Sequence, residues 1–482
     1  MGDFQQDYRK VLDESPPPEQ QDNLDEEDDG VPELDPLNSF APLNISEEAD
    51  KLTYKDHLSS ALSVFNLMNA ILGSGILGLA EAQKNIGVLP FVLMLVSTAC
   101  LALFTISLLL HLSRITGVKT YEGLAQQSFG KKGKFITSIM IVFHCMGAIC
   151  SYVFIMKNEL PEVIKVFVSY EEKPDEDLPF YLNGNFLMLI VVVGVIVPLS
   201  TMKDIKFLGY SSAFGMFCMM LFTVTVIAKK FSIPCPLPLN NTHSALANRT
   251  YNEEQYCSAK VVNLNKRSAY AVPTMFFSFM CHASMLPIYA ELRKPSLPRM
   301  QKVAAISILN VLLLYLTSAT LGYLTFYNRV ESELLLTYSL YNPDDPLIVI
   351  SRLMVIICVM LSVPLLHYPA RKTIILSMFP NPDQFFWWRH ILVMVGVLSV
   401  SVVFVLFVPN IRDIFGIAGA TSSASLLAIF PSAFFIRLTG KDATPSVRSE
   451  YSGRRKIAWA LVVLGSLFMI LSVALIVLDW LT

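Results

Sequence analysis

Three glycines interrupt the first apolar stretch of the chain, where Gly73, Gly75 and Gly78 lie within six residues. Glycine weakens a helix and lets another backbone approach closely. One interpretation is therefore a helix-packing face. The other is an unwound segment whose free N–H groups, at the positive start of a second half-helix, bind a carboxylate. In that case Gly73, Ser74 and Gly75 form the carboxylate site, and Leu72 supplies a carbonyl to the substrate ammonium.

A second interruption is predicted in the stretch from Phe276 to Pro287. Pro287 cannot donate a hydrogen bond, and its ring clashes with the carbonyl of Ala283. A lone proline usually gives an ordinary kink. Here, however, the two interrupted stretches begin two five-helix halves, which is the pattern of secondary transporters with inverted repeats. Carbonyls from Phe277 to Cys281 would then face a substrate ammonium group or a cation.

Two oxygen-bearing side chains are candidate ligands for Na⁺, a hard cation that prefers oxygen. Asn69 lies one turn before the first interruption, and Ser362 precedes Pro364 in the eighth apolar stretch. The alternative for Ser362 is a hydrogen bond to its own helix backbone, which is the commoner role of an isolated serine.

Ionisable side chains inside apolar stretches are unusual and point to function. His144, His282 and His367 could titrate and make transport pH-sensitive, although a neutral, hydrogen-bonded packing role is favoured for each. Glu81 and Lys84 stand one turn apart near the end of the first stretch. They could form an external gate, but a snorkelling surface pair is favoured.

Membrane-spanning helices must position these groups. Of the 482 residues, 53% are hydrophobic and 16% are charged, whereas soluble domains carry about 25% charged residues. A hydrocarbon core about 30 Å thick needs roughly 20 apolar residues in a helix. The apolar runs are too long and too uniform for the strands of a membrane β-barrel. We therefore predict an all-α integral membrane protein with eleven spans: 61–83, 88–112, 135–157, 184–201, 207–229, 268–290, 303–326, 346–368, 389–408, 412–437 and 457–480.

Two domains are predicted. Residues 1–55 are acidic and Pro-rich, which is typical of a disordered tail, and 56–482 form the transporter domain. Lys and Arg in the loops place this tail in the cytoplasm. The transporter domain is divided into repeat one (61–230), a lumenal loop (231–267), repeat two (268–437) and an extra helix (457–480).

The long loop 231–267 is assigned to the lumenal side by its glycosylation sequons and cysteines. Asn240 and Asn248 each begin an Asn-X-Thr sequon, which is modified only in the lumen. Cys235 and Cys257 are the only two cysteines outside the apolar stretches. An oxidising compartment favours a disulfide between them.

Three segments, 66–79, 322–335 and 408–416, resemble signatures of the sodium-coupled neutral amino acid transporters, solute carrier family 38. The resemblance covers about residues 60–480. It implies the eleven-helix, LeuT-like fold of the amino acid/polyamine/organocation superfamily, a 5+5 inverted repeat with broken helices 1 and 6. It also implies cotransport of Na⁺ with glutamine, alanine, asparagine or similar substrates.

The family resemblance also assigns roles to individual residues. A first-helix Asn and an eighth-helix Thr are linked to Na⁺ in this family, and they fall on Asn69 and Ser362, where serine keeps the hydroxyl. His144 stands where relatives usually have Gln, and Glu81 and Lys84 stand where they have uncharged residues. These departures affect the expected substrate range and pH behaviour, but not the fold.

The leading hypothesis is a secondary active transporter of small neutral amino acids, coupled to Na⁺, that needs the lipid bilayer but no cofactor and no nucleic acid. Proton coupling is one alternative. An amino acid sensor is another, motivated by the acidic tail and its Tyr8-Arg9-Lys10-Val11 motif. A membrane enzyme ranks last, because the sequence contains no zinc-spaced His pair, nucleophile elbow or catalytic Asp pair. The plasma membrane is the expected location, with a lysosomal or other endomembrane as the alternative.

Overall fold

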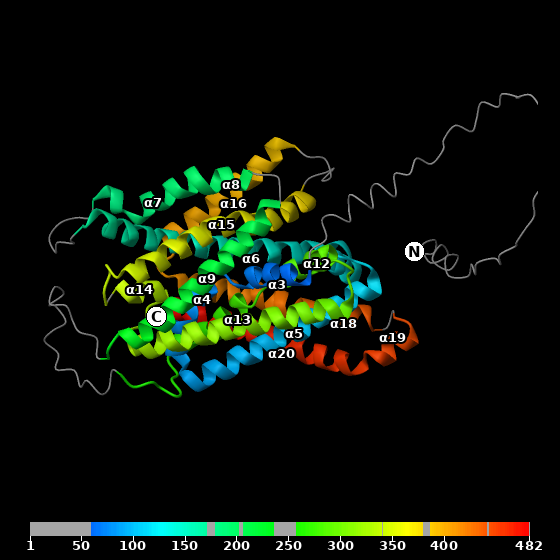
Figure 1. Ribbon diagram of the computed structural model, residues 1–482. Coiled ribbons are helices and arrows are strands. Elements are labelled where there is room, and N and C mark those ends of the chain that lie inside the picture. Colours follow the sequence, from blue (N-terminus) through cyan, green and yellow to red (C-terminus); the bar gives the residue numbers. More distant parts are fainter. Residues whose placement is uncertain are drawn as a thin grey trace, which may run out of the picture. The chain divides into compact units, whose positions relative to one another are not determined.

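The structure is a computed structural model that describes residues 59–170, 179–201, 206–235, 257–339, 341–378, 386–440 and 443–481, and only the backbone of 206–211. Every regular element in these ranges is a helix (Figure 1). The helices are α3 (Ser60–Ile71), α4 (Gly75–Ile86), α5 (Val88–Thr116), α6 (Tyr121–Val168), η1 (Phe180–Leu182), α7 (Gly184–Val191), η2 (Val192–Ile196), α8 (Val197–Thr201), α9 (Lys206–Ser232), η4 (Lys266–Tyr270), α11 (Ala271–Ser278), α12 (His282–Glu291), α13 (Leu297–Phe326), η5 (Tyr327–Arg329), α14 (Leu334–Ser339), α15 (Pro346–Met378), α16 (Trp387–Phe407), α17 (Ile411–Ala418), η6 (Gly419–Ser423), η7 (Ser425–Ile429), α18 (Phe430–Leu438), α19 (Pro445–Glu450) and α20 (Ser452–Leu481).

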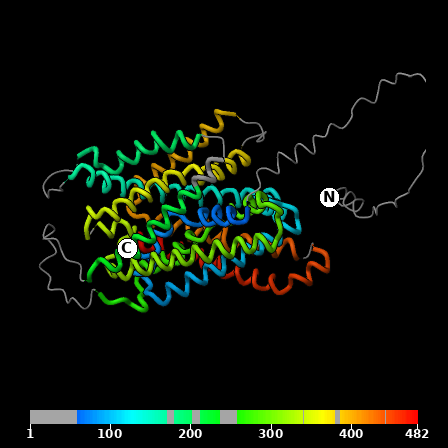
Figure 2. Tube along the Cα trace, viewed as in Figure 1, coloured from blue at the N-terminus to red at the C-terminus, as the bar shows by residue number. Residues whose placement is uncertain are grey.

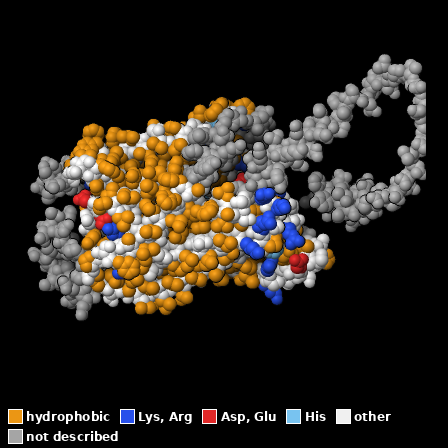
Figure 3. Space-filling view, in the orientation of Figure 1, with side chains coloured by type: hydrophobic (Ala, Val, Ile, Leu, Met, Phe, Trp, Pro, Cys, Tyr) orange, Lys and Arg blue, Asp and Glu red, His pale blue; other side chains and the backbone are white. Residues whose placement is uncertain are grey.

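Ten helices or runs of joined helices in the described ranges are long and apolar enough to cross a membrane, and the bent pair α3–α4 makes an eleventh. Hydrophobic side chains cover the flank of the bundle, whereas Lys and Arg gather at the end where α19 lies (Figure 3). Such a surface suits a hydrocarbon layer bounded by a positively charged interface. The predicted all-α, multi-pass class is confirmed.

Long helices make up most of the bundle, and the trace of α3, in blue, runs among them (Figure 2). Helices α3 and α4 pack on α13, and α4 also packs on α11. The spans α11–α12 and α17–α18 are mostly buried inside the protein, whereas α20 is mostly exposed on its surface. The spans α11–α12 and α17–α18 therefore form the interior, where a binding site can be kept away from lipid.

Local chemistry sets several helix ends. The Thr120 side chain accepts a hydrogen bond from Gly123 N and begins α6, and Asn183 caps α7 in the same way. Gly117, in the left-handed region at φ 71°, ends α5. Helix α6 is longer than the predicted span 135–157, because it begins before a kink at Gly130, where φ is 67°.

The predicted disulfide between Cys235 and Cys257 is present, with a Cα–Cα distance of 6.0 Å. The chain that follows lies against the end of α4, where Lys260 O accepts a hydrogen bond from Val88 N (3.1 Å) and the Asn263 side chain donates to Lys84 O (2.8 Å). We call this the disulfide end of the bundle. The tail 1–55 and the sequons at Asn240 and Asn248 lie outside the described residues, so the predictions made for them stay predictions.

Candidate substrate and ion site

The first interruption is a true break in the helix. Helix α3 ends at Ile71, α4 begins at Gly75, and the two halves are bent by 55°. Leu72 is extended, with φ −71° and ψ 105°. The hydroxyls of Ser74 and Ser151, the latter on α6, contact each other within the protein interior. Leu72, Gly73 and Ser74 therefore form the non-helical segment that the glycines predicted.

The second interruption is also present, but it is not located at the proline. Helix α11 ends at Ser278 and α12 begins at His282, whereas Pro287 lies inside α12. The prediction that Pro287 causes the break was wrong. Pro287 is the sixth of the ten residues of α12, so it removes one hydrogen bond, the one to Ala283 O, inside a helix that continues past it. Cys281 lies in the break, and Phe277 lies in the last turn of α11.

A single side chain, Tyr315 on α13, joins the two breaks. Its hydroxyl lies 2.9 Å from Ile71 O and 3.0 Å from Ser278 O. In a continuous helix each of these carbonyls would bond the N–H four residues later. Tyr315 is fully buried, and its single O–H is shared between the two carbonyls in place of the backbone donors that both breaks lack. The half-helix ends are thereby held side by side.

The structure shows two local roles for the glycines, close packing of helices and the unwinding of the first span. A side chain at Gly75 would overlap Ser278, with a new Cβ 3.1 Å from its Cα, so Gly75 permits close packing of α4 on α11. At Gly73 a new Cβ would instead meet the Tyr152 hydroxyl at 2.7 Å. Gly73 therefore lies in the unwound segment against the movable end of a side chain, whereas Gly75 lies against a backbone.

We expect alanine at the two positions to have different effects. Gly75→Ala should lower the amount of folded protein, because a rigid neighbour must shift, at a cost of about 1–3 kcal/mol. Gly73→Ala should fold but raise the KM for amino acid, since its methyl group enters the unwound segment. Surface expression and uptake measured together test this difference. Equal losses of expression in both variants would contradict it.

Aromatic rings surround the second break. Phe277 packs on Phe415 of α17, with 5.1 Å between ring centroids, and on His144 of α6, at 5.3 Å. His144 Nδ1 also lies 3.2 Å from the Ser423 hydroxyl, and His282 Nε2 lies 2.9 Å from the Thr105 hydroxyl. These two histidines have the hydrogen-bonded packing role favoured from the sequence.

His367 does not fit that packing role in full. It is completely buried, and neither of its ring nitrogens has a hydrogen-bond partner among the described residues. The prediction of a hydrogen-bonded histidine is wrong at this position. Arg371 and His390 lie near the His367 ring without bonding it. The packing of other helices on α15 decides which groups meet His367, and the sequence around His367 does not show this.

The two candidate Na⁺ ligands lie in one region without touching each other. The Asn69 amide donates to the Ser212 hydroxyl of α9 at 3.1 Å. A Cβ built on Gly215 would lie 2.9 Å from the Asn69 carbonyl oxygen and 3.3 Å from Cys358 Sγ. Cys358 is one turn from Ser362, whose hydroxyl donates to Cys358 O at 2.8 Å. Ser362 therefore makes the backbone bond that was the alternative role, and its hydroxyl also lies beside that of Tyr152.

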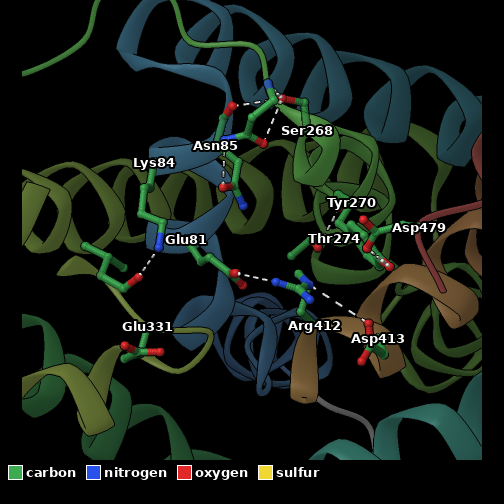
Figure 4. A network of polar contacts seen from close by, with 12 residues as sticks. Glu81, Lys84, Asn85, Ser268, Tyr270, Thr274, Glu331, Arg412, Asp413 and Asp479 are labelled. Carbon is green, nitrogen blue, oxygen red and sulfur yellow. Dashed lines mark hydrogen bonds and ion pairs between the residues drawn. The ribbon is translucent and has the colours of Figure 1, made fainter. Parts of the chain in front are cut away.

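Glu81 forms an ion pair, but with a partner that the sequence did not indicate. Glu81 Oε1 lies 3.1 Å from an Arg412 guanidinium nitrogen on α17, and both side chains are largely buried (Figure 4). Lys84 instead donates to Val330 O at 2.6 Å. The favoured interpretation of Glu81 and Lys84 as a snorkelling surface pair is wrong, because helix packing at the disulfide end covers α4 on the side that carries Glu81.

Arg412 has further partners on its own side of the bundle. Its Nε lies 3.9 Å from the Asp413 carboxylate, and its guanidinium lies over the Tyr270 ring, 4.9 Å from the centroid. The Tyr270 hydroxyl in turn donates to Asp479 of α20 at 2.9 Å. Glu81 thus links α4 to this group, and α4 is also bonded to η4, the helix of Tyr270, because the Ser268 hydroxyl donates to Asn85 O at 2.8 Å.

The sequence did not indicate Tyr152, Tyr315 or Arg412 as site residues, whereas Ser278 falls inside the predicted stretch from Phe277 to Cys281. Tyr152 and Tyr315 stand in apolar runs without a neighbouring motif, whereas Arg412 lies in the segment 408–416, whose family resemblance assigned it no role. A charged residue in a predicted span points to function, and Arg412 is such a residue because it begins the predicted span 412–437. The structure does bring together Leu72, Gly73, Ser74 and Gly75 with the end of α11 near Phe277 and Cys281.

Up to eleven spans in the described ranges, two of them interrupted at adjacent breaks, define a multi-pass membrane protein with the broken helices typical of secondary transporters. The family model described as transmembrane amino acid transporter protein matches residues 57–478. The chain belongs to this family of transporters.

Curated relatives match nearly the whole chain. It is 40% identical to sodium-coupled neutral amino acid symporter 2 of Danio rerio over 466 residues, which cover 92% of this chain and 90% of the relative. It is 39% identical to sodium-coupled neutral amino acid transporter 4 of Homo sapiens over 474 residues, which cover 88% and 84%.

Proposed function

We propose that this protein is a secondary active transporter that moves small neutral amino acids, such as glutamine, alanine or asparagine, together with Na⁺. The observation that carries the proposal is the pair of helix breaks joined by Tyr315. The names of the relatives, sodium-coupled neutral amino acid transporters, support both the substrate class and the ion.

The substrate carboxylate binds N–H groups of Gly73, Ser74 and Gly75, where the start of α4 carries partial positive charge. The substrate ammonium faces carbonyls of Leu72 and of the segment from Phe277 to Cys281. Na⁺ lies between α3 and α15, near Asn69 and Ser362. Backbone N–H and C=O groups at the two helix breaks thus bind the carboxylate and the ammonium group of the amino acid, so the site needs no ionised side chain.

Alternating access follows from the inverted repeats, 61–230 and 268–437, which rock around the fixed site. The disulfide end faces the lumen or cell exterior, the N-terminus lies in the cytoplasm, and the plasma membrane is the working location. The Glu81–Arg412 ion pair joins the repeats at the outer side. We assign it as the outer gate, which separates when α4 moves from α17.

Uptake of labelled amino acid into proteoliposomes, with Na⁺ and pH gradients imposed separately, tests this function. We expect concentrative uptake driven by inward Na⁺. Uptake driven only by the proton gradient would show that the coupled ion is H⁺ and not Na⁺. Saturable binding without flux would instead identify a sensor.

Ser362 gives a test of the cation site. Ser362→Ala should weaken apparent Na⁺ affinity, because a lost hydroxyl partner costs about 1–3 kcal/mol, or roughly five- to hundredfold. Ser362→Thr should keep wild-type affinity, since threonine keeps the oxygen. Uptake is measured against Na⁺ concentration for the three proteins. Three superimposable curves would remove Ser362 from the site and leave it with only its bond to Cys358 O.

A further inference from the structure

A second buried group of charges lies away from the helix breaks. Glu159 and Glu162 on α6 face Arg352 on α15, with Arg352 Nε 3.4 Å from Glu159 and a terminal nitrogen 3.4 Å from Glu162. Glu333, just before α14, contacts Glu159 and accepts a long hydrogen bond from the Asn158 amide at 3.5 Å. Glu159 and Glu333 are completely buried, and Arg352 is 1% exposed.

The charges of this group do not balance if every carboxyl is ionised. Glu162 is partly exposed and also pairs with Lys165 at 3.0 Å. Arg352 has one positive charge, which it shares between Glu159 and Glu162, and its Nη2 donates to Leu335 O and the Ser339 hydroxyl. Glu333 therefore adds a negative charge without a cation of its own. An uncompensated charge at a fully buried site is unfavourable by several kcal/mol.

The two carboxyl groups also lack hydrogen-bond donors. Within the described residues, neither oxygen of Glu159 nor Oε1 of Glu333 accepts a hydrogen bond from an N–H group or a hydroxyl, although all three atoms are buried. Two adjacent carboxylates can only repel each other. A single proton between them converts this repulsion into a strong O–H···O⁻ hydrogen bond and removes the surplus charge.

We infer that Glu159 and Glu333 together form a proton-binding site, occupied at neutral pH, which fastens the segment 330–339 to α6 and α15. The charged groups that face the pair are Arg352 and Glu162. The fastened segment also holds Lys84 of α4 through Val330 O. The bound proton is thus part of the packing that joins α4, α6 and α15 at the disulfide end, and it lies apart from the proposed Na⁺ and substrate residues.

The effect of pH has a definite sign. Burial, and next the charge of Glu159, raise the pKa of Glu333 well above its ordinary range. A carboxyl whose pKa is higher in the folded than in the unfolded protein binds more protons when folded. Its contribution to stability is therefore complete in acid and is lost as pH rises through the folded-state pKa.

Thermal unfolding of the purified full-length chain between pH 5 and 9 tests the inference without requiring transport. Wild-type Tm should fall toward high pH by about 1–3 °C per pH unit. Glu333→Gln should flatten this slope and raise Tm at pH 9, because the amide carries its hydrogens at every pH and still donates to Glu159. Glu159→Gln should flatten the slope as well, since Glu333 then pairs with Arg352.

Glu162→Gln is the matched control, because it removes a carboxylate from the same arginine without touching the shared proton, and it should keep the wild-type slope. The double variant Glu159→Gln, Glu333→Gln should be less stable than either single variant, because Arg352 then keeps only Glu162. A wild-type slope in Glu333→Gln, or the same flattening in Glu162→Gln, would overturn the inference. Because uptake is not measured, failure here leaves the proposed transport function unaffected.

Discussion

Tyr315→Phe is expected to reduce the kcat/KM of uptake roughly five- to hundredfold while leaving the protein folded at the membrane. Phenylalanine keeps the ring, which packs on Phe279 at 5.4 Å between centroids. It removes the hydroxyl that binds Ile71 O and Ser278 O. Leaving buried carbonyls without a partner costs about 1–3 kcal/mol, which corresponds to that range.

Tyr323→Phe provides the control for this prediction. Tyr323 lies two turns later on the same helix, is equally buried, and accepts a hydrogen bond from Lys260 N at 3.0 Å at the disulfide end. Uptake and surface expression are measured for both variants. Normal uptake by Tyr315→Phe, or equal losses in the two variants, would contradict a role for Tyr315 in joining the breaks.

The second large effect on uptake is expected when the charges of the Glu81–Arg412 pair are reversed one at a time. Arg412→Glu alone places two carboxylates together beside Asp413, and Glu81→Arg alone places two guanidinium groups together. Breaking a buried ion pair costs about 3–5 kcal/mol. We expect each single variant to lose more than nine-tenths of uptake, as a rough estimate from that energy. The double variant should recover a large part of it, because opposite charges again meet.

Lys84→Gln is the control, since Lys84 lies one turn from Glu81 but bonds a backbone carbonyl. Access of an impermeant thiol reagent to Cys281, in a background without the other free cysteines, reports whether the gate is open. We expect faster labelling in Glu81→Gln than in Lys84→Gln. Strictly additive losses in the charge-exchange cycle would show that the two residues act independently and that no gate exists between them.

Much of the fold was predictable because it depends on properties of single segments. Length and hydrophobicity alone define a span, so eleven of them were found. The glycines at 73, 75 and 78 weaken their own helix, so the break before α4 was found with its position. The disulfide was found because Cys235 and Cys257 are the two cysteines in a polar loop.

The tertiary structure alone decided which groups meet. Tyr315 joins residues 244 and 37 positions away in the chain, and Arg412 pairs with a residue 331 positions away. We predicted a pair of Glu81 and Lys84 because they lie one turn apart in the sequence, but the packing of α17 near α4 brings Arg412 to Glu81. The second break was attributed to Pro287, whose effect is local, whereas the carbonyl at that break is bound from another helix. Side-chain partners in a helical bundle are determined by which helix faces are pressed together, and a periodic apolar sequence does not encode that choice locally.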